Sequence, residues 1–364
     1  MKIHDILEAL RLPDHAQDEQ TLQKLKNWCE TNISHDLMFE GPLDVQYQQY
    51  ADVAATYRTL TDLVQTNIAT PFAQLNQMNA IQFAATRGFD NYLESLTLTD
   101  TEINIITPIG RLTPLHLAAN AGHVRAAIIC LNKGANVKAL DNQDNYPAMK
   151  CLMLTLSSRD RASRTALFEQ LRFPELLTHR NHAGETVFHL AAQFGFTSLL
   201  ENLMTDHPEG LFEANNAHQF PIQLAIRQIG ESKETLLLLL RNPDVMRTPC
   251  PITNEVPLHD AARYITEDTQ LTEAVVTASL AASVPLDVRN ASGETPLTLA
   301  IKSMNRTMID TFLAHGINLT KTDIRYAYHN TYENLSFCEF LLTKAPHLDT
   351  HILDELKAHS HSSP

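Results

Sequence analysis

Small and large apolar residues recur in the same order at intervals along the chain. The stretch Arg111–Val137 reads RLTPLHLAANAGHVRAAIICLNKGANV, and related strings begin at Glu185, Glu255 and Gly293. In each string a leucine is followed within three residues by one or two alanines. Apolar residues spaced three and four apart are typical of amphipathic helices. The pattern predicts a repeated unit with two helices.

The residues around the first helix of the unit carry start and stop signals. Thr113 can accept a hydrogen bond from an orphan backbone N–H, and Pro114 suits the first helical position. Gly122 ends this helix, because glycine tolerates a positive φ. The side chains expected to face the neighbouring unit are Leu115, Ala118 and Ala119.

A second helix follows over HVRAAIICLNKG, with Val124, Ile128 and Leu131 at helical spacing and Gly134 at its end. The polar, turn-rich segment ANVKALDNQDN then forms a projecting connection, which we call a finger, before the next unit. One such unit cannot bury its apolar face alone, so several units must stack.

The unit recurs with a period near 33 residues. Its start positions are Asn79, Thr113, Tyr146, Thr186, Phe220, Val256 and Thr295, with a degenerate eighth start at Thr322. The spacings are 34, 33, 40, 34, 36, 39 and 27 residues. A T-P-L-H-x-A motif at this period resembles the ankyrin-repeat family. The resemblance implies an all-α solenoid of seven to eight helix pairs.

The predicted organisation has three parts. Residues 1–78 form a non-repeat helical region, 79–350 the repeat domain, and 351–364 a polar tail. The N-terminal region caps the open apolar end of the first repeat, since repeat arrays need such caps. The alternative is a separate functional module.

Two spacings exceed the period. The extra residues fall at Ser157–Ser163 and Tyr264–Gln270, between the two helices of their repeats. They are predicted to emerge as loops on the edge opposite the fingers. Two interpretations remain for these segments. They are either tolerated insertions without a role or functional loops.

Composition excludes several classes of protein. The formal net charge is −14 with no basic stripe, which argues against a nucleic-acid binder. No apolar run is long enough to span a bilayer, and charges interrupt the N-terminal apolar stretch, so we expect no membrane insertion and no cleavable signal peptide. Five scattered cysteines without a CxxC pair indicate a reducing cytoplasm.

The sequence offers two candidates for a chemical site, a metal site and a nucleophile pair, and neither is convincing. His116, His189 and His259 share one motif position, but stacked repeats would hold them too far apart for a common metal ion. The family resemblance implies instead that this histidine bonds the finger backbone. Cys29 and His35 form the sole imaginable nucleophile pair. We predict no catalytic, cofactor-binding or metal site.

The predicted working surface binds another protein. The resemblance implies binding by the finger tips and by the concave face of the first helices. Matching positions on that face are Asn120, Gln193, Phe194, Arg227, Arg263, Tyr264 and Lys302. Matching finger positions are Asn142, Asp144, Asn145, Tyr146, His182, His218 and Phe220. The basic and aromatic members predict a positive strip that suits an acidic, apolar partner segment.

Three functional hypotheses follow. The first is a monomeric, non-enzymatic binding protein. Divergent repeats with a helical N-terminal segment and a Ser/His tail are similar to ankyrin effectors that intracellular bacteria deliver into the host cytosol. The second is a ubiquitin-ligase-type adaptor, since ALRLPDH resembles the start of an F-box. The third is an enzyme hidden in residues 1–78, where there is little room for a catalytic pocket.

Overall fold

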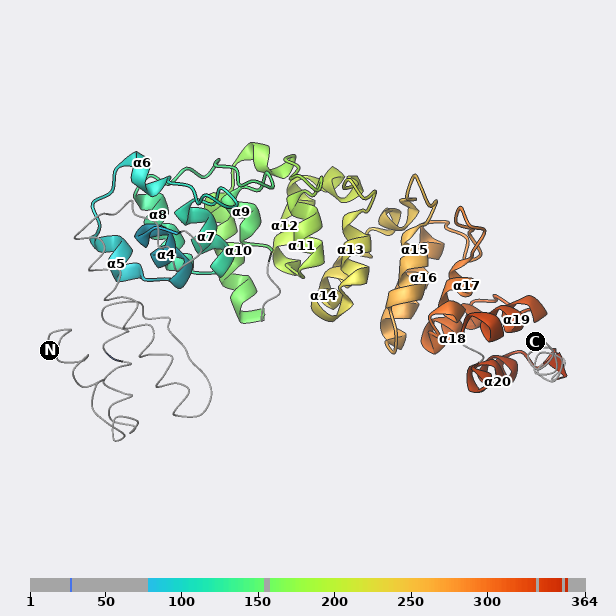
Figure 1. Ribbon diagram of the computed structural model, residues 1–364. Coiled ribbons are helices and arrows are strands. Elements are labelled where there is room, and N and C mark those ends of the chain that lie inside the picture. Colours follow the sequence, from blue (N-terminus) through green and yellow to red (C-terminus); the bar gives the residue numbers. More distant parts are fainter. Residues whose placement is uncertain (1–26, 28–77, 154–157, 332–333, 349–350, 353–364) are drawn as a thin grey trace, which may run out of the picture. The chain divides into compact units, whose positions relative to one another are not determined.

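The computed structural model describes residues 27, 78–153, 158–331, 334–348 and 351–352. Within these ranges every regular element is a helix, which confirms the predicted all-α class (Figure 1). The predicted N-terminal helices, Cys29 and His35, and nearly all of the polar tail lie outside the described residues. The described helices are each too short or too polar to traverse a bilayer.

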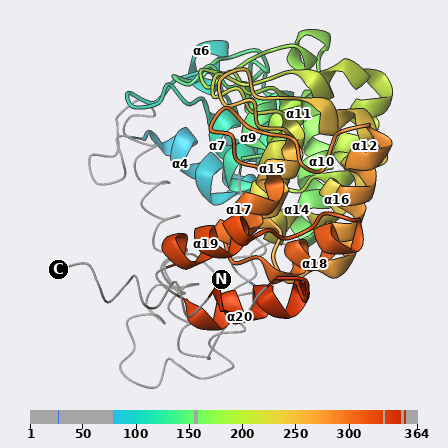
Figure 2. The same ribbon diagram turned by 90° about the vertical axis from the view of Figure 1, so that its right-hand side faces the viewer.

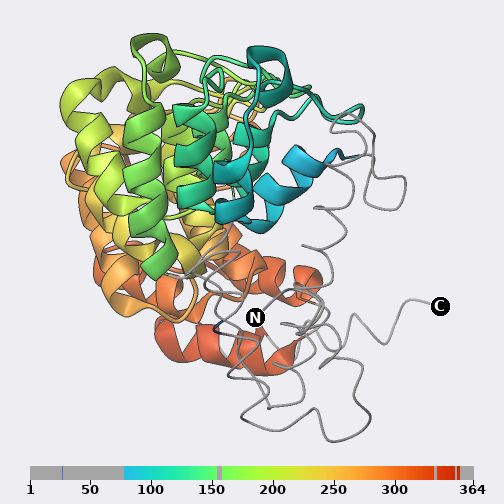
Figure 3. The same cartoon turned by 90° about the vertical axis from the view of Figure 1, so that its left-hand side faces the viewer.

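The chain divides into two compact units near residues 176–183. The first unit contains the helix pairs that precede this boundary. Its first helices α4, α7 and α9 pack in order, and its second helices α5, α8 and α10 pack in a parallel row (Figure 3). The elements are α4 Ala80–Arg87, α5 Asp90–Ser95, α6 Asp100–Ile103, α7 Pro114–Ala121, α8 Val124–Asn132, α9 Pro147–Lys150 and α10 Ser158–Leu171.

The second unit repeats this arrangement. Its first helices α11, α13, α15, α17 and α19 pack successively, each against the next (Figure 2). The first helices are α11 Val187–Gln193, α13 Pro221–Arg227, α15 Pro257–Tyr264, α17 Pro296–Lys302 and α19 Lys321–Asn330. The second helices are α12 Thr197–Asp206, α14 Ile229–Leu239, α16 Thr269–Ala281, α18 Arg306–Ala314 and α20 Leu335–Lys344. Short 3-10 turns, η1 Pro174–Leu177, η2 Pro208–Phe212 and η3 Pro243–Arg247, lie in three of the connections.

The predicted repeat starts are confirmed at seven positions and wrong at the eighth. The N-cap residues of the first helices are Asn79, Thr113, Tyr146, Thr186, Phe220, Val256 and Thr295. The last first helix is capped by Thr320, not Thr322, because the Thr320 hydroxyl pairs with Asp323. A side-chain cap satisfies backbone N–H groups that the helix leaves open.

The α7–α8 pair shows which faces are buried. Leu115, Ala118 and Ala119 are fully buried, as predicted. In α8 the buried residues are Ala126, Ala127, Ile129 and Cys130, whereas Val124, Ile128 and Leu131 are half-buried. The predicted second helix is confirmed, and its buried face, which contacts α7 and α5, consists mainly of small residues.

Both sets of extra residues lengthen helices. Residues 158–163 are the first turns of the 14-residue α10. Tyr264 is the last residue of α15, and Thr269 already begins the 13-residue α16. The predicted loops are therefore largely helix, and residues 265–268 alone remain as a connection in the second case.

Arg164 from α10 is a buried cation that stabilises the end of α7. Its guanidinium donates to the carbonyls of Ala119 at 3.1 Å, Asn120 at 2.8 Å and Cys151 at 3.0 Å. A Cβ at Gly122 would lie 2.6 Å from Arg164 Nη2, so glycine is needed for close approach as well as for its φ of +80°. A cation at a helix C-terminus complements the helix dipole.

We expect Leu115→Ala to destabilise the first unit by about 2–5 kcal/mol, because truncation of a buried leucine leaves a cavity. Leu140, which is 37% exposed, supplies the control Leu140→Ala. Urea unfolding gives the free energies, and hydrogen exchange should loosen most in α4, α7 and α9. Equal loosening in every helix of both units would contradict nearest-neighbour stacking.

Candidate partner-binding face

Each finger is a tight turn organised by the side chain of its first residue. In the 215–219 finger the Asn215 Oδ1 accepts from the amides of Ala217 at 3.0 Å and Gln219 at 2.9 Å. Asp141 does the same for the 141–145 finger, and Asn290 for the 290–294 finger. The fourth residue of each of these turns has a left-handed backbone; these residues are Asp144, His218 and Gly293.

Adjacent fingers are joined through their backbones. The amide of a residue in one finger donates to a carbonyl of the preceding finger or connection. The bonds are Asn142 to Gly110 at 2.9 Å, His182 to Gln143 at 2.8 Å, Asn216 to Ala183 at 2.9 Å and Ala291 to Thr253 at 2.7 Å. The fingers therefore dock on one another, while their exposed side chains stay accessible.

Two of the three motif histidines fix their first helix to the next finger. The backbone amide of Thr113 donates to His116 Nδ1 at 3.2 Å, and His116 Nε2 lies 3.1 Å from the Asn145 carbonyl oxygen. His189 makes the matching contacts with Thr186 and Gln219. The expected bond to the finger backbone is thus confirmed for His116 and His189, but His259 Nε2 makes no hydrogen bond to a described residue. Among the described residues no cluster of three or more potential metal ligands occurs.

Glutamine performs the same task in the first described repeat. Gln82 Oε1 accepts from the Asn79 amide at 2.9 Å, and its Nε2 donates to the Ile105 carbonyl at 3.0 Å. A neutral side chain with one acceptor and one donor is therefore sufficient at this position.

The predicted finger residues fall into two groups. Asn142, Asp144 and His182 are exposed, and Tyr146, His218 and Phe220 are half-buried. Asn145 is a correction, because it is 1% exposed. Its side chain bonds the Asp141 carboxylate and accepts from Asn181 at 3.1 Å, so it stabilises the fingers.

The predicted residues of the first helices also lie in different settings. Asn120, Gln193 and Phe194 are half-buried near the ends of α7 and α11. Arg227, Arg263, Tyr264 and Lys302 lie on α13, α15 and α17, which are consecutive in the second unit. We call these four residues the cation-tipped face.

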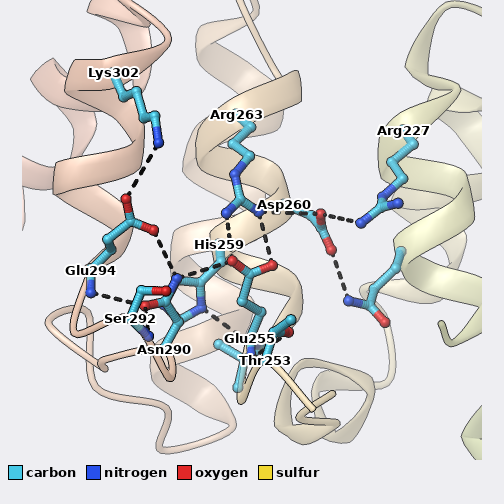
Figure 4. A network of polar contacts seen from close by, with 12 residues as sticks. Arg227, Thr253, Glu255, His259, Asp260, Arg263, Asn290, Ser292, Glu294 and Lys302 are labelled. Atoms are coloured by element: carbon cyan, nitrogen blue, oxygen red, sulfur yellow. Dashed lines mark hydrogen bonds and ion pairs between the residues drawn. The ribbon is translucent and has the colours of Figure 1, made fainter. Parts of the chain in front are cut away.

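Carboxylates behind the cation-tipped face bind its cations (Figure 4). Arg227 Nη2 lies 2.9 Å from Asp260 Oδ1, while Gln223 Nε2 donates to Asp260 Oδ2 at 2.7 Å. The Arg263 guanidinium forms a two-pronged pair with Glu255 and lies 3.8 Å from Asp260. This network ties α13 to α15.

The network continues to the next repeat. Asn290 Nδ2 donates to Glu255 at 3.0 Å and to Glu294 at 3.1 Å, and Lys302 Nζ lies 3.5 Å from Glu294 (Figure 4). The hydrogen bond from Arg263 holds the pKa of Glu255 below its usual range, and Asn290 does the same for the pKa of Glu294.

The two signs of charge differ in exposure. The carboxylate side chains of Asp260, Glu255 and Glu294 are 0%, 12% and 22% exposed. The side chains of Arg227, Arg263 and Lys302 are 34%, 28% and 54% exposed. The face therefore presents cations outward and holds their counter-charges inside. The cations of the predicted positive strip do gather, but each one is paired with a carboxylate.

Tyr264 completes this face. Its ring lies 5.7 Å from the Arg227 guanidinium carbon, and the residue is 43% exposed. A cation over an aromatic ring is attracted by the ring's quadrupole. The contact fixes the orientation of both side chains.

Sequence reasoning missed the three carboxylates. One signal was available, because Asp260 occupies the position that Leu117, Leu190 and Leu299 fill in other repeats. Those leucines are at most 5% exposed. A carboxylate at a buried position needs a partner, so it indicates a nearby cation.

Comparison with known proteins found two similarities. Residues 111–142 match the model of the ankyrin repeat family. This segment of the chain is therefore an ankyrin repeat. The chain is also similar to the crystal structure of the human ASB11 ankyrin repeat domain, with 18% identity and a TM-score of 0.44, over 66% of this chain and 99% of that chain. No curated protein matches it.

The buried motif histidine His116 makes the free energy of unfolding depend on pH. Burial lowers the pKa of His116 to about 4, from an unfolded value near ~6.5. As the pH falls, the unfolded chain takes up this proton first, so the contribution of His116 to stability is complete above about pH 6.5 and declines toward pH 4, by roughly 3 kcal/mol in total. His116→Gln keeps both hydrogen bonds, as Gln82 does, and should remove this component. Urea unfolding at pH 7 and pH 5 measures the difference, and identical pH dependence of both proteins would refute it.

The ion-pair network predicts that Arg227→Ala lowers the free energy of unfolding by about 1–3 kcal/mol, because it removes a bond from the buried Asp260. Arg241 pairs with Glu201 at 3.3 Å, and its side chain is 72% exposed. Arg241→Ala is therefore a matched control with an expected change within about 0.5 kcal/mol. Equal effects of the two changes would show that the Arg227–Asp260 pair is no more important than an exposed one.

Proposed function

We propose that this protein binds an acidic and apolar segment of another protein through the cation-tipped face. The ankyrin repeat is a protein–protein interaction fold, and this supports a protein partner. The observation that carries the proposal is the outward exposure of Arg227, Arg263 and Lys302 over buried carboxylates. No catalytic role is assigned to these residues.

The physical chemistry of the face favours such a partner. Arginine and tyrosine are enriched at the energetic centres of interfaces. Arg227 and Arg263 are already oriented by Asp260, Glu255 and the Tyr264 ring, so little side-chain entropy is lost on binding. The side chains of Arg227, Arg263 and Lys302 are 34%, 28% and 54% exposed, so carboxylates of a partner can reach N–H groups that the internal pairs do not use.

Charge also bears on specificity. The chain carries a net charge of −14, so an acidic partner meets repulsion over most of the surface. At the cation-tipped face the repulsion is replaced by attraction at close range. A partner segment with acidic residues beside an aromatic or aliphatic one therefore has one favoured place to bind.

Two finer hypotheses stay predictions. Delivery into a host cytosol as a bacterial effector depends on a tail that lies almost wholly outside the described residues. Recruitment of ubiquitin-ligase machinery depends on residues 1–78, nearly all of which also lie outside them. The proposed face is compatible with either.

Selection of displayed random peptides on the full chain tests the proposal. We expect enriched peptides with Asp or Glu next to an aromatic or aliphatic residue. The double change Tyr264→Ala with Lys302→Ala should weaken their binding at least tenfold, because truncation of interface anchors often costs about 2 kcal/mol or more. Arg241 lies just after α14 and is not part of the cation-tipped face. The change Arg241→Ala is therefore the control and should leave affinity unchanged.

Salt separates this surface from a purely apolar one. Binding of the selected peptides should weaken as ionic strength rises, since exposed charges are screened. Peptides without acidic residues, or binding that survives the double change, would contradict the proposed face.

A further inference from the structure

The last helix pairs of the second unit lack a full finger between them. Residues 282–295 connect α16 to α17, whereas residues 315–320 alone connect α18 to α19. The 290–294 finger therefore has no following finger of the same kind to dock on it. Its outer edge is the place where the pattern of finger-to-finger bonds stops.

An earlier finger shows what such an edge accepts. The turns Asn181-His-Ala-Gly-Glu185 and Asn290-Ala-Ser-Gly-Glu294 have the same form. In the former, the Ala183 carbonyl accepts from the Asn216 amide at 2.9 Å. The equivalent carbonyl of the latter belongs to Ser292, and no described residue donates a backbone amide to it.

The glycines of the two turns show the same difference. A Cβ added at Gly184 would lie 2.7 Å from the backbone nitrogen of Asn216, because the next finger packs directly on it. A Cβ added at Gly293 would meet no atom within 4 Å. The surface at Gly293 has the shape that receives a finger, and no described residue covers it.

A hollow of about 530 Å³ adjoins this edge. Its lining includes the apolar Leu286, Leu297 and Ile317, the hydroxyl-bearing Thr298, Thr320 and Tyr326, and the charged Asp287, Arg289 and Asp323. Its volume falls in the range of about 300–1,000 Å³ that ligand sites occupy.

The hollow has a structural origin. Thr298 stands at the motif position that His116 and His189 occupy, so no imidazole extends from α17. The carbonyl that such an imidazole would meet belongs to Leu319, and it contacts His347 Nε2 at 3.1 Å instead. The short residue 298 and the short 315–320 connection together leave the space.

We propose that the open edge of the 290–294 finger and the adjoining hollow bind a reverse turn of a second protein, which takes the place of a following finger. The turn begins with Asn or Asp, as the fingers of this chain do, and its second residue donates its amide to the Ser292 carbonyl. A neighbouring side chain of the turn enters the hollow. The finger shares Asn290 and Glu294 with the ion-pair network, but the proposed contacts use the Ser292 carbonyl and the hollow and none of the four residues of the cation-tipped face.

A cyclised peptide with the sequence of Glu213–Phe220, EANNAHQF, is the probe, because this finger docks on the matching turn within the chain itself. Titration of the full chain with the labelled peptide should give a Kd below about 1 mM. A peptide with proline in place of Asn216 lacks the donating amide and should lose binding.

Gly293→Asn places a side chain on the docking surface and should weaken binding at least tenfold. Asn adopts positive φ readily, and Asp144 and His218 already do so at the equivalent positions, so the fold is retained. Gly134→Asn, at a φ of +86° in the first unit, is the matched control with unchanged affinity. Unchanged melting temperatures confirm that the variants fold.

Three results would overturn the proposal. One is failure of the peptide to bind at about 1 mM. The second is equal affinity for the proline peptide or for the Gly293→Asn protein. The third is self-association of the full chain that Gly293→Asn abolishes, since the occupant would then be a second copy.

Discussion

In three of the described repeats, a hydrogen bond from the third residue of the first helix to the next finger or connection is the constraint that fixes neighbouring repeats to each other. A buried imidazole or amide must find an acceptor or donor, because an unpaired buried polar group costs about 1–3 kcal/mol. His116, His189 and Gln82 find theirs in the backbone of the following finger. These three repeats are therefore complete only when the next one is in place, and this dependence fixes the position of the finger or connection that follows.

The second unit uses the same helices to build a surface. At Asp260 a carboxylate replaces the leucine of other repeats, and burial then requires partners for it. Gln223, Arg227 and Arg263 meet that requirement from the same and the preceding repeat. The buried Asp260 carboxylate therefore orients the Arg227 and Arg263 side chains at the surface. Stability and recognition are coupled at this point, so the residues that we propose for binding also contribute to folding.

The sequence predicted what is decided within a few residues. Thr-Pro helix starts and the left-handed glycines at 122 and 134 act locally, and the structure has them as expected. Predictions that depend on distance between repeats fared worse. Asn145 was expected at the surface but bonds Asn181, and residues 158–163 were expected in a loop but begin helix α10. The pairing of Arg227 with Asp260 also spans two repeats, and no local pattern reports such a distance.

Native-state hydrogen exchange at four finger amides tests the central claim most directly. These are the amides of Asn142, His182, Asn216 and Ala291, which donate to the preceding finger or connection. If each repeat is completed by its neighbour, all four should exchange at least about 100-fold more slowly than in an unstructured chain, although they lie in surface turns. Exchange of all four at the unstructured rate would contradict the account, because the fingers would then not be fixed by the repeats before them.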